Sequence, residues 1–182
     1  MPFADQLTLT RMAAAPVVVL LFAVDFPGHD YWATALFVVA MTTDFFDGRI
    51  ARRSGRTSSF GSLLDPVADK ILVLCTLVVL LGPGVFPAWM VAAIIARELL
   101  VSGLRLAALE RGVVISARDL GKLKTWSQAT AAAAGGLAAA GVWSTSVSWW
   151  LLLLAVALTW VSGLDYARSA PSLLRGRAVA SS

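Results

Sequence analysis

The chain has 182 residues, of which 58% are hydrophobic and 14% are charged, with a formal net charge of +4. Because ordinary soluble domains carry about 25% charged residues, this composition excludes an ordinary soluble domain and indicates one compact bundle embedded in a membrane. The single cysteine, Cys75, also excludes an intramolecular disulfide.

Six apolar segments follow one another, each close to the roughly 20 residues that a helix needs to cross a hydrocarbon layer of about 30 Å. They cover about residues 7–26, 31–47, 59–81, 86–109, 123–142 and 147–166. We expect Gly48 to end the second segment, which reaches full length only if Asp44 and Asp47 belong to it. Residues 171–182 form a polar, basic tail that we expect to lack ordered structure. The predicted fold class is all-α: a polytopic membrane protein with one six-transmembrane-helix bundle over residues 1–182.

The fifth segment is rich in alanine and contains Gly135, Gly136 and Gly141. Small residues let neighbouring helices approach closely in lipid. We therefore expect this segment to pack tightly against its neighbours.

Basic residues gather in alternate linkers. The linkers at residues 27–30, 82–85 and 143–146 contain no lysine or arginine. The other linkers and the tail contain Arg49, Arg52, Arg53, Arg56, Arg111, Arg118, Lys122, Arg175 and Arg177. By the positive-inside rule, both termini then face the cytoplasm, and we expect a bacterial inner membrane protein. An aromatic belt would lie near the opposite face, made by Tyr31, Trp32, Trp89, Trp143, Trp149 and Trp150.

Four aspartates flank the first basic linker. Asp44 and Asp47 are three residues apart, and Asp65 and Asp69 are four apart, so each pair projects from one face of a helix. Because the linker is short and contains Gly55, we expect the four carboxylates to converge. Such a site needs cations, and oxygen ligands suit two hard divalent ions such as Mg²⁺ or Mn²⁺ for phosphoryl chemistry. The alternative, surface carboxylates at helix ends, is disfavoured by the cost of charge near a membrane.

A second polar group lies further along the chain. Arg97 and Arg105 are eight residues apart in the fourth segment, and Glu98 could neutralise one of them. Lys122 and Lys124 begin the fifth segment. Because intramembrane arginines usually face a polar cavity and both residue types bind phosphate, this group predicts a pocket for a phosphorylated alcohol. For the lysines, anchoring at the membrane border is an equally good alternative.

Residues 44–69 match the pattern D-x2-D-G-x2-A-R-x8-G-x3-D-x3-D at every fixed position. On this match the chain resembles the CDP-alcohol phosphatidyltransferases, integral membrane enzymes that move a phosphatidyl or related group from a CDP-linked donor to an alcohol. The resemblance implies a homodimer. It also implies that the CDP portion of the donor is bound by Asp47, Gly48, Ala51, Arg52 and Gly61. Helix packing is the alternative role for the two glycines, and Arg52 could pair with the aspartates instead.

Further motifs are similar to the phosphatidylglycerophosphate synthase branch of that family. They are Leu7-Thr8-x2-Arg11 with Pro16 downstream, Leu64-Asp65-Pro66-Val67-Ala68-Asp69-Lys70, Arg97-Glu98-Leu99-Leu100-Val101-Ser102-Gly103-Leu104-Arg105 and Gly121-Lys122-Leu123-Lys124-Thr125-x2-Gln128. The resemblance covers most of the chain from residue 7 to about residue 166. One departure is Asp5-Gln6, where the branch often has Pro-Asn.

The resemblance implies a reaction in phospholipid biosynthesis: transfer of a phosphatidyl group from CDP-diacylglycerol to sn-glycerol-3-phosphate, with release of CMP. Two ions, Mg²⁺ or Mn²⁺, would be held by Asp44, Asp47, Asp65 and Asp69. Asp69 would also be the general base, while the acceptor phosphate would be bound by Arg97, Arg105, Lys122 and Lys124.

Three alternatives to this reaction are weaker. A covalent intermediate is disfavoured because the only histidine, His29, is predicted in an outer linker. A sister enzyme with another acceptor, such as inositol phosphate, would suit the same basic pocket. A cation transporter would explain intramembrane carboxylates but not the glycines at fixed offsets or the basic residues on the same membrane side.

Overall fold

The computed structural model describes the backbone of residues 3–54, 59–110 and 119–178, with side chains at residues 10–43, 67, 70–108, 121 and 123–168. These residues form six helices and no strand, which confirms the predicted all-α class. The helices are α1 (Phe3–Ala23), α2 (His29–Ser54), α3 (Ser59–Val79), α4 (Ala88–Glu110), α5 (Asp119–Ala139) and α6 (Thr145–Ala178).

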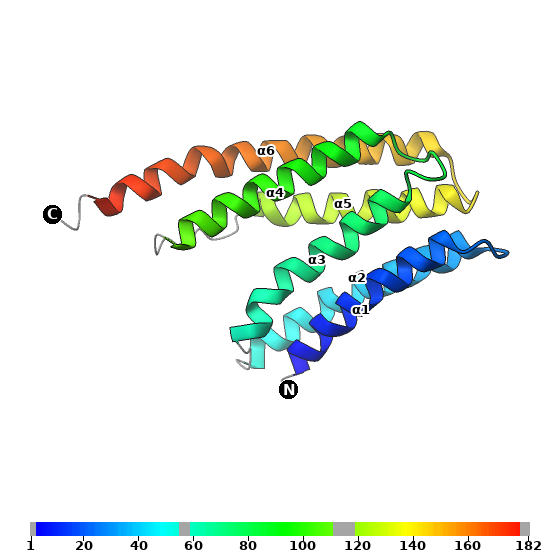
Figure 1. Cartoon of the computed structure of the whole chain (residues 1–182), viewed down its shortest axis with the longest axis horizontal. Helices are drawn as coiled ribbons and strands as arrows, with labels where there is room; N and C mark the ends of the chain where they lie inside the picture. The colour runs from blue at the N-terminus through cyan, green and yellow to red at the C-terminus, as the bar shows by residue number, and fades with distance from the viewer. Residues whose placement is uncertain (1–2, 55–58, 111–118, 179–182) are drawn as a thin grey trace.

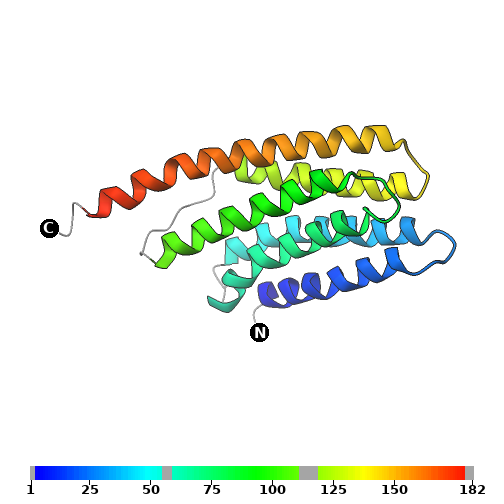
Figure 2. The same cartoon turned by 45° about the horizontal axis from the view of Figure 1, so that its top comes forward.

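Successive helices run in opposite directions along one elongated bundle (Figures 1 and 2). The connections from α1 to α2, α3 to α4 and α5 to α6 all lie at one end, and the start of α1 and the end of α6 lie at the other. The helix α5 packs on α2, α3 and α6, whereas α3 packs mainly on α1 and touches α4 and α5 over shorter stretches. In Figure 1 the ends of α1, α2 and α3 nearest the chain termini diverge from those of α4 and α6.

The apolar core runs through the middle of the bundle. Its largest fully buried side chains include Phe37 of α2, Leu77 of α3, Met90 and Ile94 of α4, and Leu152 of α6. Because lipid tails are as apolar as these side chains, close packing rather than exclusion of water would hold such helices together in a bilayer.

Two glycines of α5 lie in close contact with neighbouring segments, as the sequence predicted. A Cβ atom at Gly135 would lie 2.6 Å from Cε2 of Phe86, and one at Gly136 would lie 3.0 Å from Cβ of Thr34 and closer still to its Oγ1. The prediction was wrong for Gly141, which has a φ of 72°, and a Cβ atom added there would have no described atom within 4 Å. Gly141 instead supplies the left-handed conformation that turns the chain after α5.

Two predicted boundaries were wrong. Gly48 does not end α2, which continues to Ser54. A glycine costs a helix interior only about 1 kcal/mol relative to alanine, which the flanking helix-forming residues offset. The tail is not without structure either, because α6 continues through Pro171 to Ala178. Proline removes one backbone hydrogen bond, but the leucine, arginine and alanine residues that follow favour helix.

Among the described residues, one helical stretch, Thr145–Arg168, is long and apolar enough to cross a membrane, with a mean hydropathy of 1.9. Shorter apolar helical stretches cover Thr10–Ala23 and Lys70–Val79 among the residues that the structure describes. Large apolar side chains are also exposed along the outside of the bundle: Leu20, Val39, Leu99, Leu106, Leu154 and Val161. An apolar surface of this extent indicates contact with lipid or protein, while the number of six spans stays a prediction.

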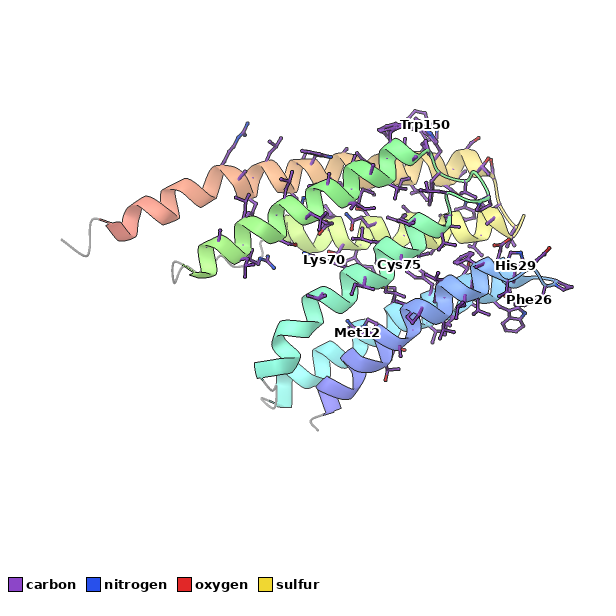
Figure 3. The ribbon with its side chains drawn as sticks, viewed as in Figure 1. Met12, Phe26, His29, Lys70, Cys75 and Trp150 are labelled. Atoms are coloured by element: carbon purple, nitrogen blue, oxygen red, sulfur yellow. The ribbon has the colours of Figure 1, made fainter. Side chains whose placement is uncertain are left out.

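The predicted aromatic belt lies toward the end of the bundle where the short described connections lie. Trp32, Trp89 and Trp150 are each more than half exposed, and Trp149 packs edge-on to Trp150 with ring centroids 4.9 Å apart. Figure 3 shows Trp150 at this end, together with Phe26 and His29. This placement fits aromatic side chains at a membrane interface.

Candidate functional site

The four aspartates lie on two neighbouring helices in the chain. Unbroken helix from His29 to Ser54 contains Asp44 and Asp47, and α3 contains Asp65 and Asp69, so each pair keeps the same-face spacing. Their carboxylates are hard oxygen donors, which fit Mg²⁺ or Mn²⁺. The side chains of these aspartates, and the surroundings of Gly48, Ala51, Arg52, Gly61 and Lys122, lie outside the described residues. Their convergence on one site therefore stays a prediction.

The described part of the site is organised around Glu98 of α4, whose side chain is only 2% exposed. Its Oε1 accepts hydrogen bonds from Nζ of Lys124, from Nη1 of Arg97 at 3.1 Å and from Nε2 of Gln128 at 3.3 Å. Its Oε2 lies 3.6 Å from Nζ of Lys70. A buried carboxylate without such partners would cost several kcal/mol, so these groups are what allows a charge at this position. The prediction that Glu98 neutralises an arginine is confirmed.

Hydroxyl groups complete this Glu98 network. Nζ of Lys70 donates to Oγ of Ser102 at 2.5 Å, and Nη2 of Arg97 donates to Oγ of Ser162 at 2.9 Å. Nε2 of Gln128 donates to Oγ1 of Thr159 at 2.8 Å. The network therefore joins α3, α4, α5 and α6.

Gly163 of α6 leaves room for the side chain of Arg97. A Cβ atom at this position would lie 2.9 Å from Nε and 3.3 Å from Cγ of Arg97. Gly163 therefore allows the guanidinium to pass close to α6 and reach both Glu98 and Ser162.

Positive charge outnumbers negative charge in the Glu98 network. The cations of Lys70, Arg97 and Lys124 face the single carboxylate of Glu98 among the described residues. Nε of Arg97 is also buried without a hydrogen-bond partner there. A site with surplus positive charge and a free guanidinium donor can bind an oxyanion such as phosphate.

Comparison with known sequences decides the family. The family model described as CDP-alcohol phosphatidyltransferase matches residues 1–161. The chain belongs to the CDP-alcohol phosphatidyltransferase family. It is therefore a transferase of phospholipid biosynthesis, and enzymes of this family are membrane-associated and generally depend on divalent cations.

Similar proteins cover most of the chain. A CDP-diacylglycerol–glycerol-3-phosphate 3-phosphatidyltransferase of Bacillus subtilis (strain 168) is 39% identical over 142 residues, 71% of this chain and 74% of that protein. One of the same name from Rickettsia bellii (strain RML369-C) is 40% identical over 89% of this chain and 91% of its own length. A probable phosphatidylglycerophosphate synthase of Mycobacterium tuberculosis (strain CDC 1551 / Oshkosh) is 38% identical over 90% of this chain and 78% of its own length.

Within this phosphatidyltransferase, two of the four predicted phosphate ligands lie in the Glu98 network, and the side chain of Lys122 lies outside the described residues. Contacts join Arg97 and Lys124 through Glu98, whereas no described contact joins Arg105 to them. The guanidinium of Arg105 instead lies 5.8 Å from the ring centroid of Tyr166, a cation–π contact between α4 and α6. The role of these residues toward an acceptor stays a prediction.

The roles of five network residues were not predicted from the sequence: Lys70, Ser102, Gln128, Thr159 and Ser162. The available signal was a polar residue within an apolar helix, which usually faces a partner. The hydrogen-bond partners themselves could not be read from spacing, since they lie 30 to 65 residues apart in the chain.

His29 lies at the start of α2, where its Nδ1 is 3.4 Å from Oδ1 of Asp30. Figure 3 shows His29 at one end of the bundle and Lys70 toward the middle, where α3 approaches α4 and α5. A role of His29 as a nucleophile beside the Glu98 network is therefore disfavoured by its position.

Proposed function

We propose that this enzyme transfers the phosphatidyl group of CDP-diacylglycerol to sn-glycerol-3-phosphate and releases CMP. The observation that carries this choice of acceptor is the surplus of cations around Glu98, because a phosphorylated acceptor needs positive charge and serine or inositol does not. The names of the similar proteins favour the same acceptor.

The donor would bind where α2 and α3 carry the family motif. Asp44, Asp47, Asp65 and Asp69 would hold two divalent ions, which supply charge neutralisation at the donor pyrophosphate and at the departing CMP. The CDP portion would lie against Gly48 and Gly61, with Asp47, Ala51 and Arg52 beside it. Glycine at those two positions permits close approach of a ligand to the helix backbone.

The acceptor phosphate would bind to Arg97 and Lys124, with Arg105 and Lys122 as further ligands. Held in this way, the free primary hydroxyl would face the donor phosphorus for in-line attack. Asp69 would take the hydroxyl proton as the new oxygen–phosphorus bond forms and the bond to CMP breaks. The transfer would be direct, without a covalent enzyme intermediate.

We also infer the setting of this reaction in the membrane. All six helices of one domain would span a bacterial inner membrane, with both termini and the aspartates on the cytoplasmic side and two copies forming a homodimer. This orientation is supported by the alternating directions of successive helices, together with the restriction of basic linker residues to alternate linkers.

An acceptor panel tests the proposed function. Purified protein would be incubated with CDP-diacylglycerol, Mg²⁺ and either sn-glycerol-3-phosphate, inositol phosphate, inositol, serine or no acceptor, with release of CMP and formation of lipid product measured. We expect equal amounts of CMP and phosphatidylglycerophosphate with glycerol phosphate, and loss of both after chelation. Faster transfer to inositol phosphate would identify the sister enzyme instead. Transport of cations without CMP release would refute the enzymatic proposal.

A further inference from the structure

The link from Lys70 to Glu98 connects the two chemically different parts of the bundle. Lys70 directly follows Asp69 on α3, and its Nζ lies 3.6 Å from Oε2 of Glu98 and 2.5 Å from Oγ of Ser102, both on α4. The other oxygen of Glu98 holds Lys124 of α5. The carboxylate of Glu98 thus contacts both α3, which carries Asp65 and Asp69, and α5, which carries Lys124.

Among the described residues, α3 packs against α4 over only a short stretch. The helix α3 packs mainly on α1, and in Figure 1 the ends of α1, α2 and α3 diverge from α4 toward the chain termini. A polar contact at the point where the helices separate is well placed to control their spacing. If Glu98 were neutral, Lys70, Arg97 and Lys124 would repel one another across the same largely buried space.

We propose that Glu98 is a positioning residue, which uses Lys70 to hold the helix bearing Asp69 at a fixed distance from the cations of α4 and α5. This inference rests on the proposed function, since the distance that matters is that between the acceptor phosphate and the base. Glu98 itself does not touch the reacting atoms. It fixes the positions of the ammonium groups of Lys124 and Lys70. Carboxylates that hydrogen-bond to metal ligands orient those ligands in the same way.

A double-mutant cycle tests this role. The proteins are wild type, Lys70→Met, Glu98→Gln and the double variant, with Glu98→Asp as the charge-conserving variant and Asp25→Asn as an exposed carboxylate-to-amide control at the opposite end of the bundle. For each, kcat and KM for both substrates are measured per folded protein. The cycle uses whichever phosphorylated acceptor the wild type accepts.

We expect kcat to fall about 10-fold to 100-fold in Glu98→Gln, because small misplacement of a bound reactant costs this much, with KM for CDP-diacylglycerol within about twofold of wild type. Lys70→Met should lower kcat less, the double variant should be no slower than Glu98→Gln, and Glu98→Asp should recover part of the rate. The proposal would be overturned if the fold reductions in kcat of the two single variants multiplied in the double variant. Near-normal kcat in Glu98→Gln would also overturn it. A purely structural role would lower the yield of folded protein and leave kcat per folded molecule unchanged.

A second readout needs no substrate. Thermal-unfolding midpoints of the same four proteins in detergent should show non-additive losses, because residues in contact couple whereas distant ones add. Additive midpoints would refute the contact itself. If the wild type failed to use glycerol phosphate while the midpoints still coupled, the proposed acceptor would be wrong and the Lys70–Glu98 link would stand.

Discussion

At the scale of single residues, the position of the Arg97 side chain depends on Gly163 of α6, which has no side chain. Its Nη1 and Nη2 reach Glu98 and Ser162 at 3.1 and 2.9 Å while its Nε passes Gly163. The cation is thereby held in a buried position, and its Nε has no hydrogen-bond partner among the described residues. A charge so constrained can bind a phosphate with little loss of side-chain entropy on binding.

Gly163→Ala should therefore affect both stability and acceptor binding. The new Cβ would lie 2.9 Å from Nε of Arg97, so the guanidinium must move. We expect a loss of about 1–3 kcal/mol in stability, which is typical of overpacking, and a higher KM for the acceptor with KM for the donor unchanged. Gly103→Ala is the matched control, because no described atom lies within 4 Å of a Cβ there. Equal behaviour of the two variants in unfolding and kinetics would contradict the crowding argument.

Asp69→Asn tests the proposed base. The amide keeps the size of the side chain but can neither accept the hydroxyl proton nor carry a charge to a cation. We expect kcat to fall by about 10²-fold to 10⁴-fold, the range associated with loss of general acid–base catalysis. The helical circular-dichroism spectrum should be unchanged. Turnover close to wild type in a protein that is folded would remove Asp69 from the mechanism.

The sequence could predict some of these residues but not their grouping. Arg97, Glu98 and Lys124 stand out because charge is rare in apolar helices. Lys70 and Gln128 are equally visible, yet their roles depend on helices meeting at a particular depth and rotation. That arrangement is set by packing between segments far apart in the chain, which residue spacing within one helix does not encode.

At the scale of helices, α5 holds the bundle together because its neighbours can approach it closely. Gly136 lies against Thr34 of α2, and Gly135 lies against Phe86 and Leu80, which belong to the connection between α3 and α4. A methyl group at either position would push the helices apart.

Gly136→Ala should destabilise the protein by about 1–3 kcal/mol, the usual cost of adding a methyl group to a packed contact. Thr34→Ala removes the two side-chain atoms that the new methyl group would meet besides Cβ. We therefore expect the double variant to recover part of the loss in thermal-unfolding midpoint. Additive destabilisation by the two substitutions would show that Thr34 is not the residue that the methyl group displaces.

The presence of each helix was easier to predict than the residues at which it begins and ends. The apolar segments predict six helices, since each apolar run approaches the length of a membrane crossing. The end of α2 lies beyond Gly48, because a glycine inside a helix costs too little to stop the helix when helix-forming residues follow. The same reasoning applies to Pro171, which α6 includes.

At the scale of the whole molecule, the alternating directions of the helices place the short described connections at one end and the chain termini at the other (Figure 2). If the bundle spans a membrane, these ends face opposite compartments. The distribution of arginine and lysine then assigns the termini to the cytoplasm.

Cysteine labelling checks this orientation. In a Cys75→Ala background, Ser144→Cys places a thiol at an exposed position between α5 and α6, and Ser182→Cys places one at the C-terminus. A membrane-impermeant maleimide should label the first in intact cells and the second only after permeabilisation. The opposite pattern would invert the proposed topology, and labelling of both in intact cells would contradict a membrane crossing by α6.

The most direct test of the central claim is to count the Mn²⁺ ions that the purified protein binds. Binding is measured by electron paramagnetic resonance in the presence of CDP-diacylglycerol. Two ions per chain are expected for the wild type and for Asp25→Asn, with binding weakened at least about 10-fold in Asp44→Asn and Asp65→Asn, since each removes a charged ligand. Two ions bound equally well by the wild type and by both of the latter variants would contradict a metal site made by the aspartates of α2 and α3.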